Sequence, residues 1–157
     1  MPDIALQPLT EGNLPALLAA AVAGADPLEV MAPVPGPAGW TAERRAAFLA
    51  FHRGRGLAAE PVELTYVVLL RGAVVGAARL QPAGAGELET GIWLARDARG
   101  RGVGRALVTL LRAAAEQAGA ARMIATTTPE NAAARGLMAG AAVRLADGAV
   151  LGTWELG

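Results

Sequence analysis

Arg99-Gly100-Arg101-Gly102-Val103-Gly104-Arg105-Ala106 separates an apolar, strand-like run, Gly91-Ile92-Trp93-Leu94-Ala95, from a helix-like run over 103–118. Glycines leave room for backbone N–H groups to close on a ligand. The N-terminus of the following helix adds a partial positive charge. Arginines surround the turn at positions 96, 99, 101 and 105. The stretch therefore predicts a cradle for a phosphate or pyrophosphate between a strand and a helix.

The spacing of these glycines excludes two familiar phosphate-binding loops. A Walker-type loop needs a lysine, and the chain contains none. The dinucleotide fingerprint Gly-x-Gly-x-x-Gly fails because Arg105 stands three positions after Gly102. The acidic residue expected about 20 residues farther on is also missing, since 119–122 holds no acid.

The spacing Arg-x-x-Gly-x-Gly, formed by Arg99, Gly102 and Gly104, resembles the acetyl-CoA pyrophosphate loop of the GNAT N-acetyltransferase superfamily. Glu89-Thr90-Gly91-Ile92-Trp93-Leu94-Ala95 resembles the fourth strand of that family, especially in ribosomal-protein acetyltransferases. Thr126-Thr127-Thr128-Pro129-Glu130-Asn131-Ala132-Ala133-Ala134 resembles its fifth strand and the helix that begins at an asparagine. The resemblance covers residues 62–143, and its strength lies in the motifs occurring together and in order.

The resemblance implies an α/β fold with a mixed, mostly antiparallel central sheet flanked by helices. In that family the fourth and fifth strands splay apart, and the acyl-CoA arm lies in the gap. The implied activity is an acyltransferase reaction, in which acetyl-CoA gives its acetyl group directly to a primary amine. A small molecule or a protein N-terminus is the implied acceptor, and a homodimer is a further possibility.

The same resemblance implies the residues that hold acetyl-CoA. Backbone groups of Ile92 and Leu94, with Trp93 between them, would bond the pantetheine arm as an added strand does. Arg99 and Arg105 would contact phosphates, whereas Arg101 is either a phosphate ligand or solvated. The remaining predicted cradle residues are Gly100, Gly102, Val103 and Gly104. Asn131 is predicted to contact the cofactor arm, and the alternative role of helix N-cap remains open.

Two carboxylates are candidates for the general base that takes a proton from the amine. Glu87 and Glu89 lie two apart on a predicted strand and so share a face. Glu89 is closer to the 91–95 run and is the preferred candidate, while an ordinary exposed carboxylate is the alternative. GNAT enzymes often use a glutamate near this position through water.

The chain departs from the family pattern at three positions. Thr126 stands where some members have a base, and Met138 stands where a tyrosine usually protonates the thiolate. Residues 140–143 replace the usual Gly-Phe at the end of the last helix. An acyl-CoA-binding module without catalysis is therefore a second hypothesis, and a structural or partner-binding domain is a third.

Composition narrows the function classes further. At 157 residues the chain predicts one domain over 1–157. Its 54% hydrophobic content includes no run long enough to span a membrane. The formal net charge of zero gives no support to a nucleic-acid partner. No cysteine is present and His52 is the single histidine, so neither a metal site nor a thiolate nucleophile is expected.

The apolar segment 14–25 resembles a secretion signal only in part, because acidic residues and no basic ones precede it. We predict an amphipathic helix there and a cytoplasmic location. His52, near the end of another predicted helix, is expected at the surface or near a helix end. A proline-rich segment, 27–37, is predicted to be a non-helical loop.

Periodicity and turn residues place the remaining elements. Predicted helices begin after the N-caps Thr10 and Thr41 and end near 23 and 53. Two more helices are predicted over 103–118, ending at Gly119, and over 131–138. Predicted strands cover 3–9, 64–70, 73–80, 87–94, 122–127, 143–145 and 150–156.

Overall fold

The computed structural model describes residues 3–138 and 140–157. Seven strands form one sheet in the order β1-β2-β3-β4-β5-β7-β6. All neighbouring strands are antiparallel except β4 and β5, which are parallel. The strands are β1 (Ile4–Pro8), β2 (Leu64–Leu70), β3 (Ala73–Gly84), β4 (Glu87–Leu94), β5 (Arg122–Thr127), β6 (Ala142–Ala146) and β7 (Ala149–Glu155). The helices are α1 (Leu14–Gly24), α2 (Pro27–Val30), α3 (Ala42–Arg55), α4 (Val103–Gln117) and α5 (Ala132–Gly136), with a 3-10 turn over Arg96–Ala98.

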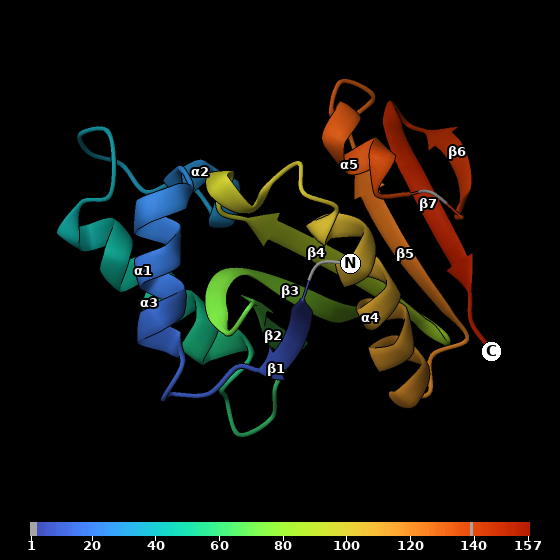
Figure 1. Ribbon diagram of the computed structural model, residues 1–157, viewed down its shortest axis with the longest axis horizontal. Coiled ribbons are helices and arrows are strands. Elements are labelled where there is room, and N and C mark those ends of the chain that lie inside the picture. Colours follow the sequence, from blue (N-terminus) through green and yellow to red (C-terminus); the bar gives the residue numbers. More distant parts are fainter. Residues whose placement is uncertain (1–2, 139) are drawn as a thin grey trace.

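Helices cover both faces of the sheet because successive strand residues point to opposite sides. Val67 and Ala77 pack with residues of α1 and α3, including the fully buried Phe48. Their neighbours Val68 and Ala78 pack on the other face, against apolar residues of α4. Figure 1 shows α1, α2 and α3 gathered beside one part of the sheet, with α4 near β5. The predicted mixed sheet flanked by helices is confirmed.

Strands β4 and β5 pair only over their first residues. Glu87, Leu88 and Glu89 align with residues 122, 123 and 124, and the pairing then stops. From there β5 pairs with β7 on its other side along its whole length. Figure 1 shows β4 and β5 diverging from a common end, with α4 in front of the gap. The splay that the resemblance implied is therefore present.

The segment of prolines holds a helix that was not expected. Pro27 occupies the first turn of α2, where its missing N–H costs nothing. Asp26 precedes it, and the Glu29 side chain accepts a hydrogen bond of 2.7 Å from the Asp26 backbone N–H. This capping box fixes a single helical turn. The prediction of a wholly non-helical loop over 27–37 was wrong.

Helix starts and strand ends also differ in detail from the predictions. Thr41 caps α3 as expected, accepting from the Arg44 N–H at 3.2 Å. Thr10 instead exchanges hydrogen bonds with Asn13 in a preceding turn, and α1 begins at Leu14. Strand β3 continues to Gly84, and α5 ends at Gly136 rather than at 138. Within the described residues, no helix combines the length and apolar character needed to cross a bilayer.

Candidate functional site

The glycine-rich turn leads directly into the N-terminus of α4. Gly100 and Gly102 have φ angles of 74° and 75°, in the left-handed region that glycine adopts without strain. Gly102 is the residue that caps α4. The first N–H groups of the helix, from Val103 onward, have no acceptor within the helix itself. The turn therefore presents backbone donors and the positive end of a 15-residue helix to one point in space.

Gly104 brings α4 close to the segment that follows β5. A Cβ atom at Gly104 would lie 2.3 Å from Cδ2 of Leu137, so only glycine permits this approach. Leu137 in turn lines the gap between β4 and β5. This glycine shapes the site through packing, although the sequence grouped it with the phosphate-binding residues.

The arginines of the turn do not all face the same way. Arg99 donates from Nε to the Leu94 carbonyl at 2.9 Å and from Nη2 to Glu29 at 2.9 Å. Arg96 lies 4.0 Å from the same carboxylate. Arg101 lines a separate hollow beside α1, and Arg105 is exposed on the first turn of α4. Arg105 is thus the arginine on the helix end itself, while Arg99 is held by protein partners.

The edge of β4 that faces the splay carries unpaired backbone groups. The Ala95 N–H donates to the Val75 carbonyl, on the β3 side. Because the direction alternates along a strand, the N–H and C=O groups of Thr90, Ile92 and Leu94 point the other way. Beyond position 89 there is no strand to meet them, and the Leu94 carbonyl accepts the Arg99 bond instead. An extended ligand laid along this edge would find a row of donors and acceptors.

A cavity of about 250 Å³ fills the gap between β4 and β5, and we call it the donor cleft. It contains two buried polar atoms without a hydrogen-bond partner in the described structure, Thr90 Oγ1 and Trp154 Nε1. Such atoms are rare in protein interiors and point to a ligand or water. Asn131, at the rim, caps α5 by accepting from the Ala134 N–H at 3.0 Å. The lining comprises residues 90–92, 108, 125–127, 131, 134, 137, 138 and 154.

A second cavity, of about 360 Å³, lies on the α3 face of β4, and we call it the acceptor cavity. Its walls come from α2, α3, β3 and β4: residues 29–32, 51, 52, 77, 79 and 91–93. Gly91 and Ile92 line both cavities. The two spaces therefore meet at one point of β4, immediately past the end of its pairing with β5.

His52 is buried in the wall of the acceptor cavity, with 2% of its surface exposed. Its ring packs edge-on against Phe48 and Phe51. Burial, together with the nearby charge of Arg79, lowers the pKa of His52 to about 4. Its Nε2 atom has no hydrogen-bond partner among the described residues. The expectation of a surface or helix-end residue was wrong, because α3 turns this position toward the sheet.

Arg79, on β3, forms the opposite wall of the same cavity. Its guanidinium lies over Gly91, where Nη2 is 3.4 Å from the position a Cβ would take. It is 5.3 Å from the centre of the Phe51 ring and 3.5 Å from the Glu63 carboxylate. Glu63 is buried and has Arg55 as its nearer partner.

The two candidate bases take different positions on β4. Glu87 forms an ion pair of 3.4 Å with Arg122, which also pairs with Glu155. Glu89 is half-buried, has no recorded ion pair, and lies on the same face as Gly91. Only Glu89 thus stands next to the point where the cavities meet, and it lines neither of them. The role of both residues stays a prediction.

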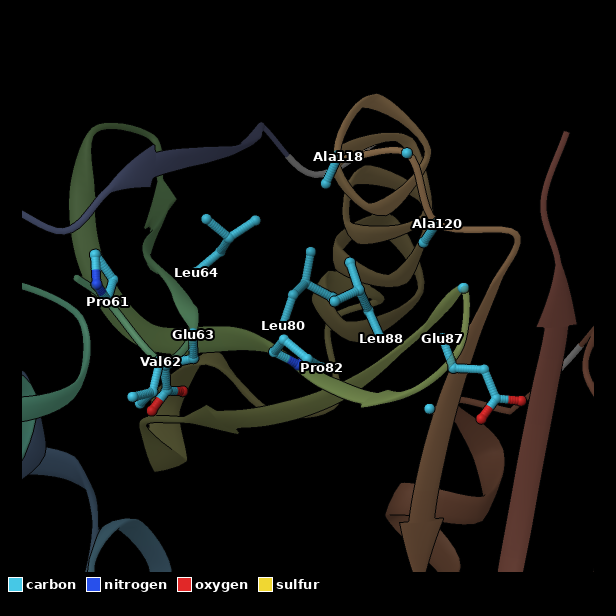
Figure 2. Close-up of a pocket in the computed structure, with 13 residues that line it drawn as sticks. Pro61, Val62, Glu63, Leu64, Leu80, Pro82, Glu87, Leu88, Ala118 and Ala120 are labelled. Atoms are coloured by element: carbon cyan, nitrogen blue, oxygen red, sulfur yellow. The ribbon is translucent and has the colours of Figure 1, made fainter.

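The largest cavity, about 560 Å³, lies at the other end of the sheet, near the end of α4 (Figure 2). Its lining is mostly apolar, with Leu64, Leu80 and Leu88 facing Ala118 and Ala120. Figure 2 shows the Glu87 carboxylate turned toward β5, where Arg122 holds it. It has neither the helix N-terminus nor the open strand edge described above, so size does not make it the candidate site.

Sequence analysis missed four groups of the site: His52, Arg79, Thr90 and Trp154. A charged residue among the small apolar residues of 73–80 was the one available signal for Arg79. The pairing of Arg79 with Gly91 is a matter of strand register, which the hydrophobic pattern of that segment leaves open. The orphaned atoms of Thr90 and Trp154 emerge only from packing.

The chain was compared with families and proteins already known. A model of the acetyltransferase (GNAT) domain matches residues 3–141. No curated protein sequence is detectably similar to the chain.

Solved structures share the fold. RimJ of Mycobacterium smegmatis, solved in complex with CoA-disulfide, is 23% identical with a TM-score of 0.75, over 97% of this chain and 81% of that one. A ribosomal-protein-alanine N-acetyltransferase of Brucella melitensis is 24% identical with a TM-score of 0.65, over 97% and 99% of the two chains. The putative acetyltransferase yncA of Salmonella typhimurium, solved with its cofactor acetyl-CoA, is 19% identical with a TM-score of 0.65, over 98% and 94%.

Proposed function

Because the chain belongs to the GNAT acetyltransferase family, we propose that it transfers an acetyl group from acetyl-CoA directly to a primary amine. One observation carries the proposal: the donor cleft and the acceptor cavity meet at Gly91 and Ile92. A thioester in one space and an amine in the other reach each other only there. Holding two reactants in this way supplies much of the rate of a bimolecular reaction.

The donor cleft suits an acyl-CoA arm. The pyrophosphate would bind at the N-terminus of α4 and the glycine-rich turn. The pantetheine amides would bond the backbone of Ile92 and Leu94 along the open edge of β4. Thr90 Oγ1 and Trp154 Nε1 would gain the partners that they lack in the protein alone. Two relatives of the same fold were solved with CoA or acetyl-CoA, which supports this choice of donor.

The reaction at the meeting point is a direct displacement. The amine nitrogen attacks the thioester carbon, a C–N bond forms, and the C–S bond breaks with its electrons going to sulfur. The proton lost by the amine passes to a base, and CoA leaves as the thiolate or takes a proton from solvent. The sequence contains no cysteine, which favours one-step transfer over a thiolate-bound acyl-enzyme.

We assign the base role to Glu89, acting through water. It lies one strand repeat from Gly91, on the acceptor face. His52 is closer to the acceptor cavity, but its pKa of about 4 makes it a weak proton acceptor. His52 instead offers its bare Nε2 as a hydrogen-bond acceptor for the incoming amine.

A second candidate function is acyl-CoA binding without turnover. Met138 is buried in the donor cleft, where the family pattern places a tyrosine that protonates the thiolate. A thioether cannot donate a proton. A module of this kind would bind acetyl-CoA and release no CoA with any amine.

Calorimetric titration with acetyl-CoA, with desulfo-CoA and ATP as controls, tests the donor site. Micromolar binding that is selective for acetyl-CoA supports the donor site, and an amine screen for CoA release then separates the enzyme from the binding module. No heat of binding would exclude both.

A pair of glycine variants localises the binding. Gly102→Glu places a negative charge at the N-terminus of α4, where the pyrophosphate is proposed to bind. Gly119→Glu is its matched control, because Gly119 has φ +88° just beyond the opposite end of α4 and open space around it. We expect Gly102→Glu alone to abolish measurable binding. Equal affinity in the two variants would move the pyrophosphate elsewhere.

A further inference from the structure

Arg79 places a cation at the inner end of the acceptor cavity. Its guanidinium lies across Gly91, the residue shared with the donor cleft. Gly91 has no side chain, so nothing on β4 covers the group from below. About a third of the Arg79 side chain is exposed, and that exposure opens to the cavity that Arg79 lines. A ligand in the acceptor cavity therefore lies within reach of this cation.

The charge of Arg79 is only partly compensated by the protein. Within the described residues its side chain donates one hydrogen bond, a long one of 3.5 Å to Glu63. Arg55 holds the same carboxylate more closely. One buried carboxylate thus serves two guanidinium groups. Arg79 keeps N–H donors and charge for another anion, and a guanidinium offers those donors in the fork geometry that fits a carboxylate.

The other charged group in the wall does not cancel this charge. The Glu29 carboxylate accepts hydrogen bonds from the Asp26 N–H and from Arg99, and Arg96 lies 4.0 Å away. The Asp26 N–H and then Arg99 lower the pKa of Glu29, so the group is ionised and already paired. His52 carries no charge near neutral pH. The cavity therefore holds an excess of positive charge at Arg79.

This excess decides which amines the cavity accepts. A simple alkylammonium ion would be repelled by Arg79, as protonation of His52 is. An amine that carries a carboxylate brings the missing anion with it. The remaining walls are largely apolar, with Val30, Met31, Phe51 and Trp93 among them. About 360 Å³ is the size of a small-molecule site.

From this arrangement we infer that the acceptor is a small amino acid with an apolar side chain, whose carboxylate binds Arg79 and whose amine faces Gly91 and Ile92. The inference rests on the proposed acetyl transfer and adds its substrate class. Arg79 is the specificity-determining residue. The carboxylate docks on β3, and the amine is thereby aligned with the point where the thioester enters.

Three amines of equal carbon skeleton test the inference with the wild-type protein: L-leucine, L-leucinamide and 3-methylbutylamine. The readout is acetyl-CoA-dependent CoA release, with acetyl-CoA affinity measured separately by calorimetry. We expect kcat/KM for leucine to exceed both other values by about tenfold or more, since a charge-assisted pair is lost with either. Equal or greater activity with leucinamide, which mimics a peptide N-terminus, would overturn the inference and leave the proposed function standing.

Variants then assign the preference to Arg79. Arg79→Gln should lower kcat/KM for leucine by about tenfold or more and change that for 3-methylbutylamine by less than about threefold. Arg53→Gln, which removes an exposed charge of α3 paired with Glu11, is the control and should keep the preference. Arg79→Lys keeps a cation beside Glu63 if the glutamine variant folds poorly, and it should retain part of the leucine preference.

The outcomes separate the two proposals. Unchanged leucine preference in Arg79→Gln, with acetyl-CoA affinity intact, overturns the role of Arg79. Acetyl-CoA binding without CoA release from any of the amines contradicts the proposed function, and this inference falls with it.

Discussion

Arg99 and Glu29 form an ion pair of 2.9 Å that joins the glycine-rich turn to the wall of the acceptor cavity. The two residues lie 70 positions apart in the sequence. The pair means that a predicted phosphate ligand is bound to a carboxylate in the protein alone. A pyrophosphate at the turn would compete with Glu29 for the same guanidinium.

Glu29→Gln is therefore expected to tighten acetyl-CoA binding. The amide keeps an acceptor for the Asp26 N–H but removes the negative charge beside Arg96 and Arg99. Both side chains are partly exposed, so the gain should be modest, about two- to fivefold in Kd. Calorimetry at low ionic strength measures it, and Glu43→Gln, an exposed acidic position on α3, controls for net charge. Weaker binding in Glu29→Gln would show that the carboxylate positions Arg99 for the phosphate.

His52 should make the stability of the protein depend on pH. Its folded-state pKa of about 4 lies below the ordinary value of 6.5, so the unfolded chain binds a proton that the folded chain does not. The stability contribution is complete above pH 6.5 and is lost as pH falls toward 4. Between pH 6.5 and 5 the loss is about 2 kcal/mol.

Urea unfolding at pH 7 and pH 5 measures this loss. His52 is the single histidine of the chain, and the lowered pKa of Glu29 acts below this window. Removing the group by His52→Gln should make the free energy of unfolding nearly independent of pH between 5 and 7. An equal pH slope in the wild type and the variant would mean that another group is responsible.

Glu89→Gln should reduce kcat about a hundredfold, the lower range for loss of a general base. It should also flatten the rise of activity with pH, because the titrating group is gone. Affinity for acetyl-CoA should stay within about twofold, since Glu89 does not line the donor cleft. Glu87→Gln is the competing variant: a flattened profile there, with a normal one in Glu89→Gln, would transfer the role to Glu87.

Gly104→Ala should weaken acetyl-CoA binding by moving Leu137. The new Cβ would lie 2.3 Å from Leu137 Cδ2, and Leu137 lines the donor cleft. Overpacking costs about 1–3 kcal/mol, against a gain of about 1 kcal/mol for alanine within a helix. We expect a net loss of stability of about 1 kcal/mol in urea unfolding and a higher Kd.

The double variant Gly104→Ala/Leu137→Ala tests this mechanism. Removing the leucine side chain relieves the clash, so the affinity should recover toward that of Leu137→Ala alone. If the two effects simply add, Gly104 acts through the phosphate-binding backbone and not through Leu137.

Local chemistry made much of the fold predictable. Arg71-Gly72 and Asp147-Gly148 both adopt positive φ angles, as two-residue hairpin turns require. Gly119, φ +88°, ends α4 at the predicted position. The order of the strands followed from these turns and from the alternating apolar pattern between them.

Contacts distant in sequence were not predictable. Helix α2 is four residues long, and its signal, Asp26 with Glu29, is masked by the surrounding prolines. The acceptor cavity joins side chains from α2, α3, β3 and β4. Its two notable members, His52 and Arg79, meet because the β3–β4 register sets Arg79 opposite Gly91 under α3. No local pattern encodes that register.

The two cavities share only Gly91 and Ile92. Every other wall residue of the acceptor cavity belongs to elements that do not touch the donor cleft. Mutation of those walls can therefore redirect the protein to a different amine while its donor specificity is inherited unchanged. The same division makes the 29–32 and 51–52 segments, with Arg79, a natural starting library for evolving new acceptors on this scaffold.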